Sequence, residues 1–313
     1  MTQTYLKQMA RFDINSLPDL DAVVLAALEG FMKRGVPELD LGSYRRPLVV
    51  GSGNAAATGR ILFEGTDAVF ADEGTYTAKL RAVRGIDGAI LISASGRKHA
   101  IVIAKDLRKR KIETRLLTCN PAAPAAEHVD ADKVFEFEKN REPYTYNTST
   151  YMAMVLGKTN ENPGKIRRHI LDKVHGRVRG DLACRYDAFY LLVPTRFDTI
   201  REMFLTKFDE LFGPKISGRV FTPEQTKHAK TVVSSPSELF ISFGCRNKVF
   251  GDPASRLEIP LPAGAGYGAL MAIGYYVIGR LQAQFPPYFK TGVEAYTKNA
   301  SRVFGQDLRP IVE

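Results

Sequence analysis

The sequence predicts an α/β protein in which two doubly wound, parallel-sheet halves follow an N-terminal helical extension. From residue 46 onward, short apolar strands alternate with helices, which is the pattern of a parallel sheet with helical crossovers. The alternation resumes beyond a polar, basic segment at residues 157–181, which we interpret as the link between the halves. We therefore expect the extension over residues 1–45, the first half over 46–180 and the second half over 181–313.

Each predicted element follows from periodicity and composition. The extension contains an amphipathic helix at residues 20–34, where apolar side chains recur at helical spacing from Val23 to Phe31. The first half contains apolar strands at residues 46–50, 89–92 and 114–118, with a helix after the first strand and another at residues 98–108. The second half contains strands at residues 188–193 and 239–243 and helices at residues 198–212 and 267–284.

Small polar turns separate the first two predicted strands from the helices that follow them. The turns are Gly51-Ser52-Gly53-Asn54 and Ser93-Ala94-Ser95-Gly96. Backbone N–H groups and the helix dipole attract anions at such a place, so the two turns predict a phosphate cradle. The alternative is that Ser95 only caps the following helix. In the second half, Pro194-Thr195-Arg196 stand where a serine loop would be, so we expect the phosphate to bind to the first half.

The Gly51-Ser52-Gly53 turn also raises the possibility of a dinucleotide site. The third glycine of that fingerprint would fall at Ala56, and Asp72 or Glu73 is the nearest acidic candidate for a ribose contact. The missing third glycine and the lack of an acidic residue at the expected distance after a following strand both disfavour a dinucleotide site.

Several motifs resemble the sugar isomerase (SIS) domain of phosphosugar isomerases and of the isomerase half of glucosamine-6-phosphate synthase. The family pattern strand–Ser-x-Ser-Gly-x-Thr–helix is matched by Ser93, Ser95 and Gly96, and its acidic-then-Ser/Thr segment by Glu142 and Thr148-Ser149-Thr150. The resemblance covers residues 46–156 and, more loosely, 185–285. It implies two SIS-type, flavodoxin-like halves and no cofactor.

The resemblance also implies which residues bind the substrate phosphate. These are Ser52, Gly53, Asn54, Ser93, Ser95, Gly96, Lys98 and Thr148. Two positions depart from the family: Lys98 stands where a threonine is usual, and Asn54-Ala55 stand where Thr-Ser is common. A lysine can hold phosphate as a point charge, so the first departure is compensated.

The catalytic residues that the resemblance implies are Glu210 and His228, both in the second half. Glu210 ends the helix at residues 198–212, with Asp209 as a rival, and Lys227-His228 matches the family's Lys-His pair. The family's Gly-Pro after that histidine is replaced by Ala229-Lys230. The alternatives are a surface glutamate and a polar loop histidine. SIS proteins of similar layout complete their site with a histidine from a neighbouring subunit, so we expect at least a homodimer.

The chemistry of aldose–ketose isomerisation needs these residue types. A histidine titrates near neutrality and can open the sugar ring. A partly buried carboxylate has a raised pKa and can move a proton between C1 and C2 through an enediol. We therefore expect a phosphosugar isomerase, or a related sugar-phosphate deglycase. The alternative is a sensor that binds a phosphosugar without catalysis, which the departures at Lys98, Ala55 and Ala229-Lys230 favour.

Composition limits the partners. The net charge of +10 is compatible with a nucleic acid partner or with the steering of phosphorylated substrates, and its densest basic run, residues 105–111, is interpreted as a solvated helix face. We find no nucleic-acid-binding signature and expect no nucleic acid partner. The three scattered cysteines suggest a reducing cytoplasm, and the spacing of the five histidines predicts no metal site. The apolar run at residues 269–278 is too short to span a membrane, and we expect no signal peptide.

Overall fold

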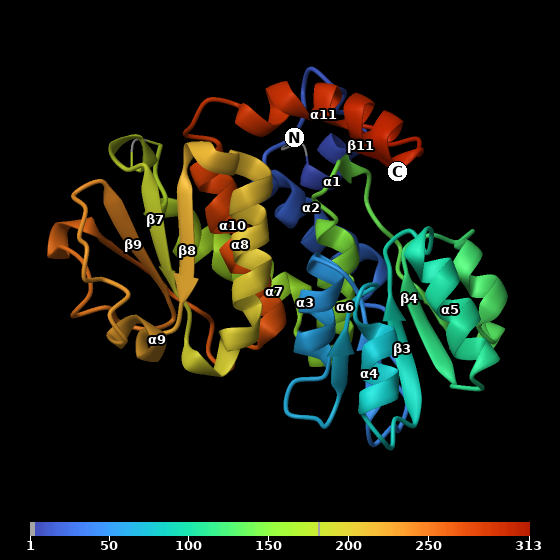
Figure 1. The fold of residues 1–313 in the computed structure, drawn as a ribbon. Coiled ribbons are helices and arrows are strands. Elements are labelled where there is room, and N and C mark those ends of the chain that lie inside the picture. Colours follow the sequence, from blue (N-terminus) through green and yellow to red (C-terminus); the bar gives the residue numbers. More distant parts are fainter. Residues whose placement is uncertain (1–3, 181) are drawn as a thin grey trace. The chain divides into compact units, whose positions relative to one another are not determined.

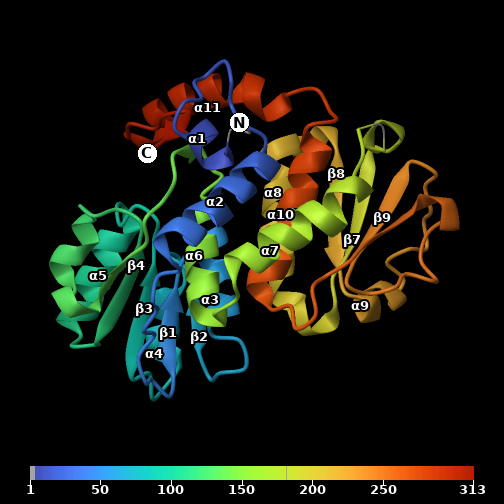
Figure 2. The same ribbon diagram turned by 180° about the vertical axis from the view of Figure 1, so that it is seen from behind.

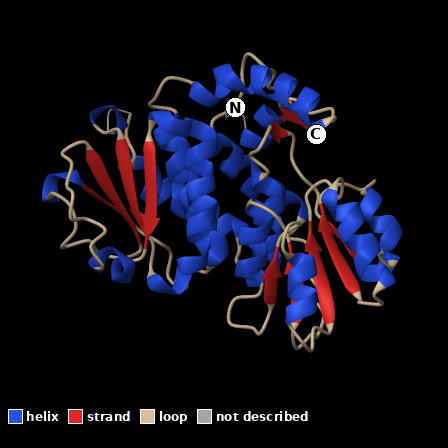
Figure 3. Cartoon of the chain, viewed as in Figure 1, coloured by secondary structure: helices blue, strands red, loops and turns tan. Residues whose placement is uncertain are grey.

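The structure is a computed structural model that describes residues 4–180 and 182–313, so Asp181, at the predicted start of the second half, lies outside the described residues. The chain forms two compact units. One, called here the N-terminal sheet unit, contains Val36–Lys139 and Thr150–Asn160. The other, the C-terminal sheet unit, contains the residues up to Gly35, Asn140–Ser149 and Glu161–Glu313. Figure 3 shows that each unit combines strands and helices.

The N-terminal sheet unit is built on a parallel sheet in the order β2-β1-β3-β4-β5. The strands are β1 (Pro47–Val50), β2 (Val69–Ala71), β3 (Gly88–Ile92), β4 (Thr114–Thr118) and β5 (Val134–Glu136). This is the flavodoxin-like order, in which the chain reverses direction across the sheet between β1 and β3. The predicted strands at residues 46–50, 89–92 and 114–118 correspond to β1, β3 and β4.

Helices cover both faces of this sheet. On one face, Ala89 and Leu91 of β3 share a core cluster with α5 (His99–Lys109) and with Tyr76 of α4 (Tyr76–Ala82). On the other face lies α3 (Asn54–Leu62), and Figure 1 shows α3 and α5 on opposite sides of the sheet. A Cβ on Gly59 of α3 would lie 2.7 Å from Val49, so glycine allows this helix to approach the strand closely. The first half is therefore doubly wound, as predicted.

The C-terminal sheet unit repeats the topology with one strand fewer. Its parallel sheet has the order β10-β9-β7-β8, from β7 (Ala188–Leu192), β8 (Ser217–Phe221), β9 (Glu238–Phe243) and β10 (Arg256–Ile259). Numbered within each half, the first sheet reads 2-1-3-4-5 and the second reads 2-1-3-4. The α/β class with parallel sheets is thus confirmed.

The two faces of the second sheet are covered differently. Helices α8 (Arg201–Phe212) and α10 (Tyr267–Gln282) pack against one face, where Phe204 lies 5.8 Å from Phe243 between ring centroids. On the other face, Tyr190 stacks on Phe240 at 4.8 Å, and the short α9 (Pro223–Lys227) touches Tyr190 through Thr226. Within the described residues, long helices therefore cover only one face, so the second half departs from the doubly wound prediction.

The predicted N-terminal extension belongs to the C-terminal sheet unit. Besides α1 (Tyr5–Met9), it contains α2 (Leu20–Arg34), whose bounds match the prediction. Helix α2 packs on α10 so closely that a Cβ on Gly279 would lie 2.0 Å from the backbone nitrogen of Asp21. The predicted boundary at residue 45 therefore does not coincide with the observed division, because α2 is part of a core that the C-terminal half completes.

The polar segment at residues 157–181 is also different from the predicted link. It contains α7 (Pro163–His169) and a π-helical turn, Ile170–Val174, inside the C-terminal sheet unit. Apolar side chains at every fourth position, Ile166, Ile170, Val174 and Val178, are buried. This spacing was hidden by the many basic residues between them, and the predicted boundary at residue 180 consequently falls beyond the end of these helices.

The remaining regular elements complete the two units. Helix α6 (Thr148–Thr159) begins in the C-terminal sheet unit and ends in the N-terminal one. In the C-terminal unit, α11 (Tyr288–Phe304) precedes β11 (Ile311–Val312), which pairs antiparallel with β6 (Glu142–Pro143). Figure 2 shows α11 and α2 from behind.

Candidate functional site

The two predicted phosphate loops lie next to each other at one edge of the first sheet. Strands β1 and β3 are parallel neighbours, with Val50 opposite Leu91 near their carboxyl ends. The turns that follow, residues 51–54 and 93–98, therefore emerge side by side. In open parallel sheets, this edge at the reversal of strand order is where ligands bind.

The two loops end in the same unusual backbone conformation. Gly53, the N-cap of α3, has φ 55° and ψ −126°, and Lys98, the N-cap of α5, has φ 51° and ψ −120°. Glycine adopts such a conformation readily, whereas a lysine is strained there by roughly 1–3 kcal/mol. Backbone strain of this kind collects at ligand sites. The strained backbone at Lys98 is therefore a more specific sign of a ligand site in the second loop than the positive charge of its side chain.

The serine loop is held in shape by its own contacts. The Ser93 hydroxyl accepts the Gly96 N–H at 3.1 Å, and Asn120 Nδ2 donates to the Ser95 carbonyl at 2.8 Å. Gly96 has φ 60°, and a Cβ there would lie 2.5 Å from that of Ala123. The N-cap of α5 is Lys98, so the structure does not support the alternative that Ser95 is simply a helix cap.

The first loop carries two further polar groups. The Ser52 hydroxyl donates to the carboxylate of Glu73, in the turn after β2. Asn54 is 8% exposed, and its Oδ1 has no hydrogen-bond partner in the described part of the chain. A buried amide oxygen without a donor at a helix N-terminus is a feature that a donating group of a bound ligand would explain. Sequence reasoning considered Glu73 only as a ribose contact and missed its proximity to Ser52.

Thr148, the other predicted phosphate ligand, is completely buried in the C-terminal sheet unit. Its N–H donates to Glu142 Oε2 at 2.6 Å, and the Ser149 N–H donates to Glu142 Oε1 at 2.8 Å. Burial raises the pKa of the Glu142 carboxyl, and these hydrogen bonds oppose the rise. The N-terminus of α6 thus already holds an internal carboxyl group.

Glu210 lies in the last turn of α8 beside a buried lysine. Lys207 Nζ donates to Glu210 Oε2 at 2.6 Å and to the carbonyls of Tyr146 and Thr145 at 2.8 and 3.1 Å. The side chains of Lys207 and Glu210 are 0% and 18% exposed. Burial raises the pKa of the Glu210 carboxyl above its ordinary value of 4.5, and the Lys207 ammonium opposes the shift. Glu210 is therefore not the solvated surface residue of the alternative interpretation.

The rival carboxylate, Asp209, points elsewhere. It lines a cavity of about 530 Å³ between the end of α8 and the start of β8, together with Leu205, Phe208 and Ile216. Of the two neighbours, Glu210 has the environment that a proton-transferring carboxylate needs.

His228 is exposed and directly follows α9. Figure 1 shows α9 at the opposite end of β8 from the C-terminus of α8. The strand between them has five residues and spans about 16 Å. A single chain therefore does not bring His228 and Glu210 together. Ala229, which follows His228, has φ 62° and keeps a left-handed conformation although it is not a glycine.

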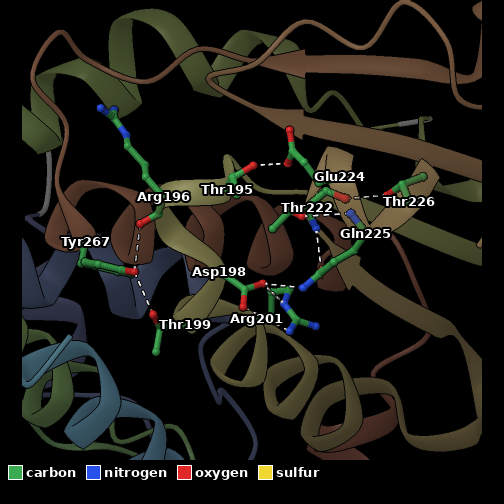
Figure 4. A network of polar contacts seen from close by, with 10 residues as sticks. All are labelled: Thr195, Arg196, Asp198, Thr199, Arg201, Thr222, Glu224, Gln225, Thr226 and Tyr267. Atoms are coloured by element: carbon green, nitrogen blue, oxygen red, sulfur yellow. Dashed lines mark hydrogen bonds and ion pairs between the residues drawn. The ribbon is translucent and has the colours of Figure 1, made fainter. Parts of the chain in front are cut away.

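The carboxyl edge of the second sheet is filled by the protein's own carboxylates (Figure 4). Asp198 Oδ1 accepts from Arg201 Nε at 2.6 Å and from Gln225 Nε2 at 2.8 Å. The Thr195 hydroxyl donates to Glu224. The polar groups at this edge are therefore hydrogen-bonded to one another.

In residues 4–180 and 182–313, no group of three or more histidine, cysteine and acidic side chains could hold a metal ion. Over the same ranges, no helix has both the length and the hydropathy of a membrane span.

The topology defines an open parallel α/β protein, and its β1–β3 edge is the candidate ligand site. No protein-family model and no curated protein matches the sequence. Solved structures do match. The C-terminal domain of glucosamine-fructose-6-phosphate aminotransferase from Francisella tularensis is 11% identical, with a TM-score of 0.58 over 90% of this chain and 99% of that one. Tagatose-6-phosphate ketose/aldose isomerase from Escherichia coli is 15% identical, with a TM-score of 0.56 over 90% and 92% of the two chains.

A third match, glucosamine-6-phosphate deaminase from Thermotoga maritima, is 14% identical, with a TM-score of 0.59 over 82% of this chain and 90% of that one. These likenesses confirm the fold that the resemblance to the SIS family implies. At such low identities they carry the fold and not the activity.

Proposed function

We propose that this protein binds a sugar phosphate at the β1–β3 edge and acts as an aldose–ketose isomerase or a related sugar-phosphate deglycase. The observation that carries the binding site is the pair of adjacent loops with matching backbone conformations at Gly53 and Lys98. Ser93, Ser95 and the N–H groups of the second loop bind the phosphate, and Lys98 adds a point charge.

In this proposal, Glu210 moves the proton between C1 and C2. Its raised pKa makes the carboxylate a better base for a carbon-bound proton than an exposed glutamate would be. Lys207 holds the carboxylate in one orientation through their 2.6 Å contact. His228 opens the ring and comes from a second copy of the chain, because one copy keeps it about a strand length from Glu210. The proposal therefore includes a homodimer or a higher oligomer.

Binding and catalysis are tested separately. A panel of hexose and pentose phosphates is screened by thermal shift, and the best ligand is titrated against Ser95→Ala. Loss of one hydrogen bond to a charged group should weaken binding by about 1–2 kcal/mol. Ser301→Ala is the control, because it also removes a serine hydroxyl, but one in α11 that hydrogen-bonds to Leu308 and belongs to neither loop. Equal affinities of the two variants would refute the site.

The second candidate is a phosphosugar sensor without catalysis. The separation of His228 from Glu210 within one chain favours it. Exchange of the C2 proton with solvent, followed by NMR on the bound ligand, distinguishes the two functions. An isomerase exchanges this proton, and Glu210→Gln abolishes the exchange while ligand affinity stays within about twofold. A sensor binds with no exchange, and a monomer by light scattering would exclude the shared site.

A further inference from the structure

The carboxylate of Glu73 lies beside the candidate phosphate site. A negative charge is unexpected there, because it repels an anionic ligand. The strand order β2-β1-β3 places three turns in a row along the carboxyl edge. Glu73 follows β2, Ser52 follows β1, and Ser93 and Ser95 follow β3. The contact between Ser52 and Glu73 joins the first two turns.

The turn that carries Glu73 is fixed by its neighbours. Asp72 Oδ1 accepts the N–H groups of Gly74 and Thr75 at 3.0 and 2.9 Å and the Thr75 hydroxyl at 2.7 Å. The Thr75 hydroxyl also accepts the Asp72 N–H at 3.0 Å. These hydrogen bonds fix the backbone of the turn at the carboxyl edge of the sheet. The turn therefore places Glu73 where its carboxylate contacts Ser52.

The hydrogen-bonding capacities of this pair decide what fits beside it. A sugar hydroxyl both donates and accepts, so it can donate to Glu73 while accepting from Ser52. A phosphate dianion only accepts, and the Glu73 carboxylate repels it. The loop after β3 has no such carboxylate in the contacts described above, and Lys98 at its end is basic. The two loops therefore suit different parts of one ligand.

We infer that Glu73 is a specificity-determining residue that makes the Ser52 end of the site accept a sugar hydroxyl and reject a second anionic group. The inference rests on the proposed function, and it assigns the phosphate to the loop after β3 and Ser52 to the sugar. The outer two turns are two strand spacings apart, about 10 Å, which suits the length of a six-carbon sugar phosphate. The ligand class is a sugar monophosphate with a free hydroxyl at the end remote from the phosphate.

The test compares two ligands by calorimetric titration of the full chain. They are the hexose 6-phosphate that binds best in the thermal-shift panel and the corresponding hexose 1,6-bisphosphate. Wild type should bind the monophosphate at least about tenfold more tightly. Glu73→Gln removes the repulsion and one strong acceptor, so it should weaken monophosphate binding about fivefold and strengthen bisphosphate binding. The preference should then fall about tenfold or more.

Glu64→Gln is the matched control, because it removes the same charge beyond the C-terminal end of α3, away from the carboxyl edge. It should leave the preference unchanged, and a similar loss of preference in this control would reduce the effect to overall charge. If the monophosphate binds and Glu73→Gln leaves the preference intact, the inference is overturned while the proposed function stands. If neither sugar phosphate binds wild type, both fail together.

Discussion

Replacement of Lys98 by glycine should stabilise the protein and weaken its ligand binding at the same time. Lys98 has φ 51° and ψ −120°, a conformation that Gly53 also adopts in the neighbouring loop. Relief of the strain at this positive φ is worth roughly 1–3 kcal/mol. The greater freedom of glycine in the unfolded chain takes back about 0.5–1 kcal/mol. From the middle of each range, the net gain is about 1 kcal/mol, or roughly 1–3 °C in Tm.

Binding should change in the opposite direction. Loss of the ammonium from the phosphate site should weaken sugar-phosphate affinity by about 1–2 kcal/mol, which is roughly five- to thirtyfold. Lys98→Gln separates the two effects, because it removes the charge but keeps the Cβ and its strain. This variant should lose affinity as Lys98→Gly does and keep the wild-type Tm.

Differential scanning calorimetry and isothermal titration measure the two quantities. A lower Tm for Lys98→Gly would refute the strain argument, since it would mean that the lysine side chain stabilises the loop. Unchanged affinity in both variants would refute the assignment of Lys98 to the phosphate. A role for Lys98 in both strain and phosphate binding requires both a higher Tm for Lys98→Gly and a lower affinity in both variants.

Three further predictions concern stability. Ala229→Gly should raise Tm by roughly 1–3 °C, because Ala229 has φ 62°, and a fall in Tm would contradict this. Gly274→Ala should destabilise by about 1–3 kcal/mol in urea unfolding, because its Cβ would lie 2.1 Å from Phe204. Gly292→Ala, with open space around it, should not destabilise the protein. Because burial raises the pKa of Glu142 above 4.5, its stabilising protonated form is lost as pH rises through that pKa. The unfolding free energy should therefore fall more steeply with pH in wild type than in Glu142→Gln, and parallel pH profiles would exclude this origin.

The strands that sequence predicted well are those buried on both faces. Residues 114–118 form β4 with the predicted bounds, and β3 is predicted to within one residue, because their apolar runs follow from burial under helices. β2 (Val69–Ala71) was missed because a three-residue edge strand with half-buried side chains leaves little pattern. Local periodicity therefore reveals the sheet centre and not its edges.

The candidate site was predictable to different degrees. The loops at Ser52 and Ser95 follow from strand–turn–helix patterns, which are local. The burial of Lys207 is not local, because it depends on carbonyls at Thr145 and Tyr146, about sixty residues earlier in the chain. The contact of Glu73 with Ser52 depends on β2 lying beside β1, which no local pattern reveals.

The packing of α2 on α10 sets the order in which the protein can fold during synthesis. Most of the N-terminal sheet unit is one contiguous stretch, Val36–Lys139, and can fold soon after it emerges. Helix α2 is made earlier but must wait for α10, since the Leu20 N–H bonds to Gln282, 262 residues later. At about 5–20 residues per second, this delay is roughly 15–50 s. For that time the apolar side chains of α2 that pack on α10 in the folded protein stay uncovered, so this early helix needs shielding by chaperones.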